Sequence, residues 1–360
     1  MAETVLISGN EAVARGAIQA GCKYFFGYPI TPQSDIPEFM ARELPKIGGA
    51  FVQSESETAS VYMLYGGGMA GARVMTSTSS PGFSLMQEGI SYIAELEIPC
   101  VIVNVSRMGP GIGTGGQHGQ TDYRQATKGG GHGAYRCIVL APASSQECFD
   151  FTQLGFHLAD KYRMLALVLS DYVVGQTAEP VEIRTLDLGS VPDKPWALKG
   201  KAQKGGKRSV LVSGAAARGG VVDYHVKVKE KYQQVARDQV RYEPYQTEAA
   251  DLLLVAYGST ARFCEGAVEI ARAKGMKVGL FRPITLWPFP EEALRDAALE
   301  AGKVLVVEDS PGELVEDVEK AVRHHVPVHL LGVWGRHNTG ASGIIHPERI
   351  LEEVEKVCPS

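Results

Sequence analysis

The chain has 360 residues, which is enough for two or three domains, and its 44% hydrophobic and 21% charged residues are ordinary for a globular protein. A net charge of −5 argues against a nucleic-acid partner, because such a chain offers no uniformly basic face. Its longest apolar runs, "IPCVIVNV" and "DLLLVAY", are far shorter than the ~18 residues of a membrane span, and its start does not resemble a signal peptide. We therefore expect a cytoplasmic protein without a membrane segment.

Short apolar runs alternate with helical patterns over residues 1–185. The runs that are typical of buried strands read "KYFFGY", "AFVQS", "ARVMTST", "PCVIVNV", "RCIVLAP" and "MLALVLS". This alternation predicts an α/β fold with a largely parallel sheet and crossover helices on both faces. Ligands gather at the carboxyl ends of such strands, and four of the runs end there in polar or glycine-rich loops, at residues 28–33, 53–58, 77–83 and 106–123.

The first of these loops lies in "GYPITPQSDIPEFM", residues 27–40. Pro29 and Pro32 favour a stiff, extended turn after the strand, because proline fixes its own backbone and restricts the residue before it. The pattern predicts that this turn presents Thr31.

The second loop, "QSESETAS" at residues 53–60, places two glutamates where a strand meets a helix. Ser54 and Glu57 have the spacing of a capping box, which gives Glu57 a structural role. Glu55 then faces the crevice at the strand ends. There it is either a proton-sharing carboxylate or a surface acid favoured by the helix dipole.

The fourth loop follows Arg107, which comes directly after the apolar strand "IPCVIVNVS". A guanidinium in this place suits bidentate capture of a carboxylate, and a structural ion pair is the alternative. His118 in the same loop is either a proton donor or a solvated histidine.

A connector at residues 186–250 begins rich in lysine and glycine and ends in an amphipathic helical pattern at residues 221–240. Its stretch Asp193–Arg208 holds five lysines and one arginine against a single acid, which indicates a solvated linker or a surface that docks an anion or a partner. We expect the helix to strap the domains together. A second βα series over residues 251–360 predicts a compact second α/β domain.

Common cofactor motifs are missing from the sequence. The six cysteines never have CxxC spacing, so iron–sulfur clusters and zinc ribbons have no support in this chain. Two GxGxxG matches, at residues 66–71 and 111–116, have the wrong context for a dinucleotide-binding turn. Neither NAD nor ATP is expected.

Several motifs together resemble the alpha subunit of the thiamine-diphosphate-dependent 2-oxoacid:ferredoxin oxidoreductases, namely "YPITP", "QSESETASV", "GARVMTSTSSPGFSLMQEGISY", "PCVIVNVSRMGPG" and "QATKGGGHGAYR". The later segments "LLLVAYGSTAR", "GLFRPITLWPFP" and "KVLVVEDSPGELVEDV" look like that family's transketolase-C-terminal-like domain. The resemblance implies a pyrimidine-type thiamine diphosphate-binding domain over residues 1–185, the connector at 186–250, and a transketolase-C-terminal-like domain over 251–360.

The resemblance also implies roles for single residues. Thr31 would contact the 2-oxoacid, and Pro29 would lie beside the cofactor's pyrimidine. Glu55 would share a proton with the aminopyrimidine N1′, and Arg107 would bind the substrate carboxylate.

The family's Mg²⁺-diphosphate clamp usually reads GDG, which this chain lacks. The resemblance therefore implies that a beta subunit supplies the diphosphate, Mg²⁺ and [4Fe-4S] cluster ligands, with gamma and ferredoxin-like delta subunits as further partners. The implied reaction decarboxylates a 2-oxoacid, passes electrons to ferredoxin and transfers the acyl group to CoA. A non-catalytic scaffold or regulatory subunit on the same fold is the alternative from a different class.

The loop "GPGIGTGGQHGQTDY" is similar to that of the 2-oxoisovalerate type, whereas relatives acting on 2-oxoglutarate tend to read "GPSTGLPT". No lysine or arginine lies between Arg107 and Arg124 to pair with a distal carboxylate, and an unpaired charge would be costly. We therefore expect an apolar branched 2-oxoacid. Because His118 is able to receive a second carboxylate, 2-oxoglutarate stays open, as do aryl 2-oxoacids.

Overall fold

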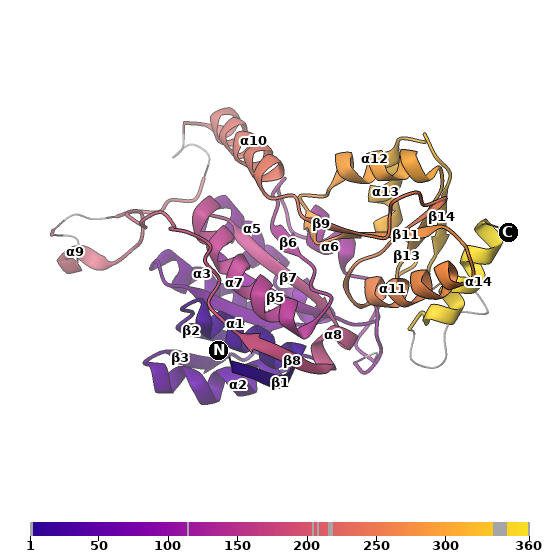
Figure 1. The fold of residues 1–360 in the computed structure, drawn as a ribbon. Helices are drawn as coiled ribbons and strands as arrows, with labels where there is room; N and C mark the ends of the chain where they lie inside the picture. Colours follow the sequence, from indigo (N-terminus) through magenta and orange to yellow (C-terminus); the bar gives the residue numbers. More distant parts are fainter. Residues whose placement is uncertain are drawn as a thin grey trace.

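Two β-sheets with helices on their faces form an α/β fold in the computed structural model (Figure 1). The structure describes residues 3–113, 115–203, 205–206, 209–214, 219–333 and 344–358. The larger sheet has seven strands in the order β12-β6-β7-β5-β4-β2-β3. Its parallel part consists of the six strands that the sequence predicts, β2 (Tyr24–Gly27), β3 (Ala50–Gln53), β4 (Val74–Thr78), β5 (Cys100–Ser106), β6 (Ile138–Leu140) and β7 (Leu165–Asp171).

Helices cover both faces of this sheet, which explains why its central strands β5 and β7 carry buried apolar residues on both faces. Along β5, Cys100 and Ile102 join the core under α3 (Glu57–Met69) and α5 (Gln87–Glu95). Val101, Val103 and Val105 point to the opposite core, which is covered by α1 (Gly9–Gln19), α2 (Asp35–Glu43) and α7 (Ser145–Tyr162). Short helices complete this half of the chain: η1 (Leu44–Ile47), α4 (Ser80–Leu85), α6 (Tyr123–Lys128) and α8 (Tyr172–Gln176).

The smaller sheet has five strands in the order β14-β13-β10-β11-β9. These strands are β9 (Tyr242–Tyr245), β10 (Leu252–Val255), β11 (Val278–Pro283), β13 (Val304–Val307) and β14 (Val328–Leu331). One face packs against α11 (Gly258–Ala273) and α14 (Pro347–Val357), and the other against α12 (Glu291–Ala301) and α13 (Leu314–Val322). The βα series expected after residue 251 is therefore present.

The two sheets exchange strands, which the sequence does not predict. β12 (Thr285–Trp287) comes from the second βα series but pairs antiparallel with β6 in the larger sheet. β9 lies within the expected connector but pairs antiparallel with β11 in the smaller sheet. One hydrophobic cluster contains residues of both sheets, so they share a core. A separate pair, β1 (Glu3–Ser8) with β8 (Ala178–Ile183), is antiparallel.

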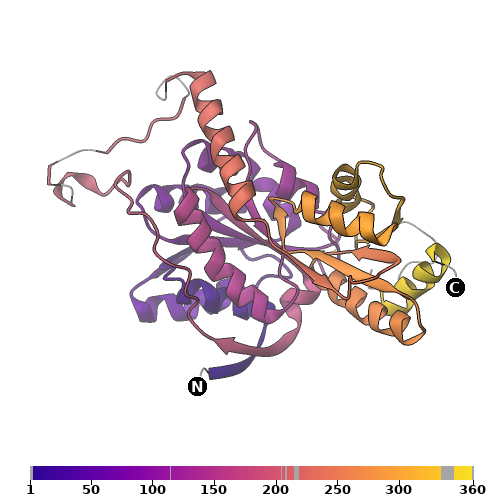
Figure 2. The same cartoon turned by 45° about the horizontal axis from the view of Figure 1, so that its top comes forward.

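The connector leaves the body of the molecule in an extended path that carries α9 (Gly200–Gln203), and it returns through α10 (Val221–Asp238) (Figures 1 and 2). α10 packs on the larger sheet's half of the chain and leads directly into β9 of the smaller sheet, as expected of a strap. In the lysine-rich stretch, Lys194 pairs with Asp160. Residues 204, 207 and 208 of that stretch lie outside the described residues.

Glu97 holds α10 against the larger sheet's half of the chain. Its carboxylate accepts hydrogen bonds from Lys231 Nζ at 2.7 Å and Lys227 Nζ at 2.9 Å. Burial alone would raise the pKa of Glu97, but the two ammonium groups outweigh it and lower the pKa to about 2. The pKa of Lys231 is lowered, because the effect of burial is larger than the opposing effect of Glu97. Of the two groups, Glu97 is therefore the one whose shifted pKa makes stability depend on pH in acid.

Glu97→Gln is expected to destabilise the protein by about 1–3 kcal/mol, because it replaces charge-assisted hydrogen bonds with neutral ones. The control is Glu230→Gln, which changes an exposed glutamate of α10. Since the folded pKa of Glu97 is depressed, its stabilisation is complete above pH 4.5 and is lost as the pH falls toward 2. Thermal unfolding curves of the variant and the parent should therefore converge in acid, and a constant difference would contradict this assignment.

No helix within the described part of the chain combines the length and apolar character needed to cross a membrane.

Candidate functional site

Strands β5, β4, β2 and β3 are parallel neighbours, so their carboxyl ends meet at one edge of the larger sheet. The loops that follow these strands contain every residue that the sequence singles out as a candidate. This edge of the larger sheet is therefore the candidate site.

The loop after β2 is fixed to the end of β4. Gln33 is fully buried; its amide donates to Tyr28 O at 3.2 Å and its carbonyl accepts from the Ser77 hydroxyl. Pro29 and Thr31 are exposed on this loop, as a turn that presents Thr31 requires. The carbonyl of Thr31 accepts a hydrogen bond from Arg107 Nη1 at 2.7 Å, which brings the two predicted substrate residues together.

Helix α3 begins differently from the expectation. The N-cap is Ser56, whose hydroxyl accepts from Ala59 N at 3.2 Å. Ser54 instead donates its hydroxyl to backbone carbonyls, at 2.9 Å to Ser56 and 3.3 Å to Gly27 of β2. The expected capping box of Ser54 and Glu57 is therefore wrong, because the neighbouring strand and the turn before α3 use the Ser54 hydroxyl.

As a result, Glu57 lies in the environment that the sequence led us to expect for Glu55. Glu57 is only 4% exposed, whereas Glu55 is exposed to solvent. A Cβ atom on Gly82 would lie 2.4 Å from Glu57 Oε1, so glycine is needed for the carboxylate to occupy this space. Burial raises the pKa of Glu57, against the opposing charge of Arg107. A partly desolvated carboxyl group of this kind is suited to proton sharing.

Arg107 is a buried cation that no described carboxylate neutralises by an ion pair. The residue is 4% exposed, and its Nη2 donates to Ile112 O at 3.2 Å. Its Nε is buried and has no partner among the described residues. Burial lowers the pKa of Arg107, while Asp122 and Glu57 oppose this shift. The alternative of a structural ion pair therefore has no support among the described residues, and capture of a carboxylate ligand by Arg107 stays a prediction.

Ser80, Asn104 and Asp122 form a buried polar network next to Arg107, which was not predicted from the sequence. Ser80 Oγ donates to Asp122 Oδ2 at 2.6 Å and accepts from the backbone N of Arg107 at 3.0 Å. Asn104 Nδ2 donates to the same Asp122 oxygen at 2.8 Å. Burial raises the pKa of Asp122 despite these hydrogen bonds. The signal in the sequence was Asn104, a polar residue inside an otherwise apolar strand.

A cleft of about 710 Å³ adjoins this network and the loop that holds Arg107. Its apolar lining includes Pro81, Pro110 and Ile112, and its acidic lining consists of Asp122 and Glu313. Arg124 also lines the cleft, but it pairs with Glu316.

His118 does not line this cleft, so the structure gives no support to the alternative in which it receives a second carboxylate of the substrate. The histidine is 1% exposed, and its Nε2 lies 2.8 Å from Asp309 Oδ2. It is neither solvated nor aimed at the candidate site.

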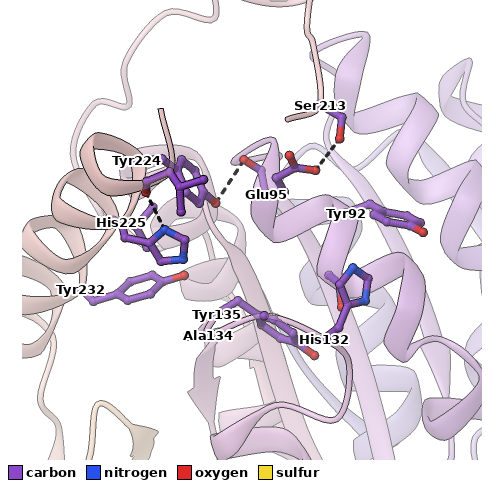
Figure 3. A pocket seen from close by; sticks show the side chains of 13 residues that line it. Tyr92, Glu95, His132, Ala134, Tyr135, Ser213, Tyr224, His225 and Tyr232 are labelled. Atoms are coloured by element: carbon purple, nitrogen blue, oxygen red, sulfur yellow. Dashed lines mark hydrogen bonds between the residues drawn. The ribbon is translucent and has the colours of Figure 1, made fainter. Parts of the chain in front are cut away.

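A second cavity, of about 370 Å³, lies between α5, the loop after α6 and α10 (Figure 3). Tyr and His side chains dominate its lining, as the close-up shows for Tyr92, His132, Tyr135, Tyr224, His225 and Tyr232. None of the candidate site residues lines it.

Residues 15–244 match the family model described as "Pyruvate flavodoxin/ferredoxin oxidoreductase, thiamine diP-bdg". The chain belongs to this family. Residues 250–341 match a second model, "Pyruvate:ferredoxin oxidoreductase core domain II". The resemblance found in the sequence is thus confirmed: the chain is an alpha-type subunit of a 2-oxoacid:ferredoxin oxidoreductase.

Relatives of this alpha-type subunit include the ketoisovalerate oxidoreductase subunit VorB of Methanothermobacter marburgensis, 47% identical over 88% of this chain and 90% of the relative. The 2-oxoglutarate synthase subunit KorA of Methanothermobacter thermautotrophicus is 39% identical over 99% of this chain and 100% of the relative.

Among solved structures, the 2-oxoglutarate:ferredoxin oxidoreductase of Magnetococcus marinus, with 2-oxoglutarate, coenzyme A and succinyl-CoA bound, has a TM-score of 0.80 at 28% identity. It covers 99% of this chain, which spans 65% of the length of that chain. A split-gene transketolase with a TM-score of 0.60 and 13% identity covers 97% of this chain and shows a shared fold. The fold class predicted from the sequence is confirmed.

The site of the alpha-type subunit fits the pyrimidine half of thiamine diphosphate. Glu57 supplies a desolvated carboxyl group, and the absence of a Cβ atom at Gly82 is what gives this carboxylate its place. The hydroxyls of Thr76 and Ser79, in and after β4, are buried without partners among the described residues and offer further polar contacts near the same edge.

Proposed function

We propose that this chain supplies the pyrimidine side of a shared thiamine diphosphate site, in an enzyme that oxidatively decarboxylates a branched 2-oxoacid such as 2-oxoisovalerate to an acyl-CoA. The observation that carries the proposal is the convergence of Glu57, Thr31 and Arg107 at one edge of the larger sheet. A desolvated carboxyl group after β3 and an unneutralised guanidinium after β5 lie there, close enough that each influences the pKa of the other. Thiamine diphosphate, when bound, supplies the electron sink that decarboxylation of a 2-oxoacid requires.

Glu57 is the carboxylate that we assign to N1′ of the aminopyrimidine, the role expected for Glu55 from the sequence. The helix start buries Glu57 and leaves Glu55 exposed in this chain. A carboxyl group with a raised pKa holds and returns a proton near neutral pH better than an exposed one. Pro29 lies on the exposed loop after β2 and keeps its proposed place beside the pyrimidine.

Arg107 binds the carboxylate of the 2-oxoacid, and Thr31 contacts the same substrate. Arg107 donates one hydrogen bond to the carbonyl of Thr31 and one to the carbonyl of Ile112. These two bonds fix the direction of the guanidinium. Its remaining N–H groups include the unpartnered Nε, so the fork can still donate to a carboxylate. Binding removes the cost of leaving a buried donor unpaired.

The substrate side chain is placed in the cleft that adjoins the loop after Arg107, although Arg107, Thr31 and Glu57 do not themselves line it. The lining of this cleft supports an apolar side chain. Asp122 and Glu313 would repel the distal carboxylate of 2-oxoglutarate, and Arg124, which lines the same cleft, is already paired with Glu316. Pro81, Pro110 and Ile112 present apolar surface instead. The 47% identity to a ketoisovalerate oxidoreductase subunit, against 39% to a 2-oxoglutarate synthase subunit, points the same way.

Partner subunits complete the enzyme in this proposal. A beta subunit provides the ligands of the diphosphate, Mg²⁺ and [4Fe-4S] clusters, and gamma and ferredoxin-like delta subunits are further partners. The support is the sequence, which lacks both a GDG clamp and cluster-type cysteine spacing. All six cysteines are free thiols, and all but Cys358 are buried.

The test is an assay of the native complex with viologen as electron acceptor, CoA, and a panel of 2-oxoacids. We expect the highest specificity constant for 2-oxoisovalerate and related branched acids. The pure single chain should be colourless and inactive. Stoichiometric iron–sulfur absorbance in the pure chain would refute the division of cofactors, and a preference for 2-oxoglutarate would refute the apolar side-chain site. A complex without 2-oxoacid oxidation would favour a scaffold role.

A further inference from the structure

The loop between β5 and α6 is closed on itself and carries Arg107 at its start. Met108 N donates to Gln117 O at 3.0 Å across the base of the loop. A Cβ atom on Gly119 would lie 2.7 Å from Met108 Cα, so the two ends touch. Because Ile112 in the middle of the loop accepts from the Arg107 guanidinium, whatever fixes the end of this loop also fixes Arg107.

The end of the loop is bound to residues outside the candidate site. His118 Nε2 lies 2.8 Å from Asp309 Oδ2, and its Nδ1 lies 3.8 Å from Asp171 Oδ1. Asp171 ends β7 of the larger sheet, whereas Asp309 follows β13 of the smaller sheet. The imidazole thus bridges the strand ends of both sheets, and all three side chains are buried.

Gln120 adds a second attachment to the smaller sheet. Its backbone N donates to Asp309 O at 2.7 Å, and its amide donates to Tyr257 O at 3.0 Å. Asp309 N donates back to Gln120 Oε1 at 3.2 Å. These contacts anchor the end of the loop to the segments that follow β10 and β13.

The charges that face the imidazole among the described residues are the two aspartates. Helix α11 contributes the hydroxyls of Ser259 and Thr260, which donate to Asp171 and Asp309 respectively, and Ser259 Oγ also lies 3.4 Å from His118 Nε2. Burial opposes protonation of His118, but Asp171 and Asp309 outweigh it and raise the pKa of the histidine. A protonated imidazole donates from Nε2 to Asp309 and places its positive charge 3.8 Å from Asp171, so it compensates both carboxylates.

We propose that His118 is a positioning residue which, as an imidazolium between Asp171 and Asp309, docks the Arg107 loop onto the smaller sheet and thereby sets the affinity for the 2-oxoacid. Its effect on catalysis rests on the function proposed for Arg107, whereas the docking of the loop does not. The contribution of His118 to docking is complete where the imidazole is protonated and is lost as the pH rises through its raised pKa, whereas the Gln120 hydrogen bonds remain.

The first measurement compares His118→Ala and His118→Gln in the intact complex, with His325→Ala as an exposed histidine control. His118→Ala should raise KM for every 2-oxoacid by roughly 10–100-fold with kcat changed much less, as expected for a displaced binding group. His118→Gln, which retains one donor toward Asp309, should recover part of this loss. The control should match the parent. Equal loss of kcat and kcat/KM, or unchanged kinetics, would overturn the proposal.

The second measurement is hydrogen exchange of residues 108–118 as a function of pH, which needs no catalytic activity. In the parent, the amide exchange rate of this loop should rise with pH more steeply than the intrinsic exchange rate once the pH passes the pKa of His118. Asp309→Asn should move this additional rise to lower pH. In His118→Ala the loop should exchange fast at every pH while β10 stays protected. Exchange without this pH dependence would refute the imidazolium bridge. If the complex oxidises no 2-oxoacid yet shows these exchange results, the proposed function fails and the docking stands.

Discussion

Replacing Glu57 by glutamine is expected to reduce 2-oxoacid oxidation by about 10²–10⁴-fold, the usual cost of losing a positioned proton-transfer group. Glutamine has nearly the same shape, so the contact with Gly82 and the helix start capped by Ser56 should persist. The measurement is steady-state turnover of the reconstituted complex, together with thiamine diphosphate affinity and subunit stoichiometry. The loss should appear in kcat, with assembly intact.

Glu55→Gln is the matched control, because it makes the same chemical change two residues earlier on an exposed side chain. We expect activity within about twofold of the parent, since exposed substitutions rarely perturb a protein by more than ~0.5 kcal/mol. If Glu55→Gln abolishes turnover and Glu57→Gln does not, the assignment from burial is wrong and the one drawn from the sequence is right.

Arg107→Lys is expected to weaken binding of every 2-oxoacid by about 1.5–3 kcal/mol, a 10- to 150-fold rise in KM. Lysine keeps the charge but loses the planar fork, and it cannot donate to Thr31, Ile112 and a carboxylate from fixed directions. KM should be measured for 2-oxoisovalerate, 2-oxoglutarate and an aryl 2-oxoacid.

The three substrates act as internal controls for this variant, because they share the 1-carboxylate and differ only in the side chain. A similar increase for all three supports contact with the shared carboxylate. An increase confined to 2-oxoglutarate would show instead that Arg107 reads the distal carboxylate.

The sequence was sufficient for the parts of the fold that depend on local pattern. Six apolar runs became the parallel strands of the larger sheet, and the helical pattern at residues 221–240 became α10. The sequence also predicted the position of Arg107 correctly. A residue directly after a parallel strand lies at the edge of the sheet where ligands bind. The domain limits at residues 185 and 250 stay a prediction.

The sequence was insufficient where tertiary contacts choose between equivalent local patterns. Ser54 and Ser56 both have the chemistry of an N-cap, and only the nearby carbonyls that engage Ser54 decide which of them starts α3. The environment of His118 depends on Asp309, a residue 191 positions away. β12, which spans only Thr285–Trp287, was too short to predict as a strand and finds its partner β6 in the other βα series.

The exchange of β12 and β9 also limits how this chain can be divided. A break near residue 248 would leave β6 with a bare edge in one fragment, since its partner β12 would depart with the other. The departing fragment would lose β9 and expose the edge of β11 in turn. Unpaired strand edges of this kind template aggregation, and the hydrophobic cluster shared by the two sheets would open to water as well. The two βα series are therefore expected to be inherited, synthesised and degraded together, as one indivisible piece of the enzyme.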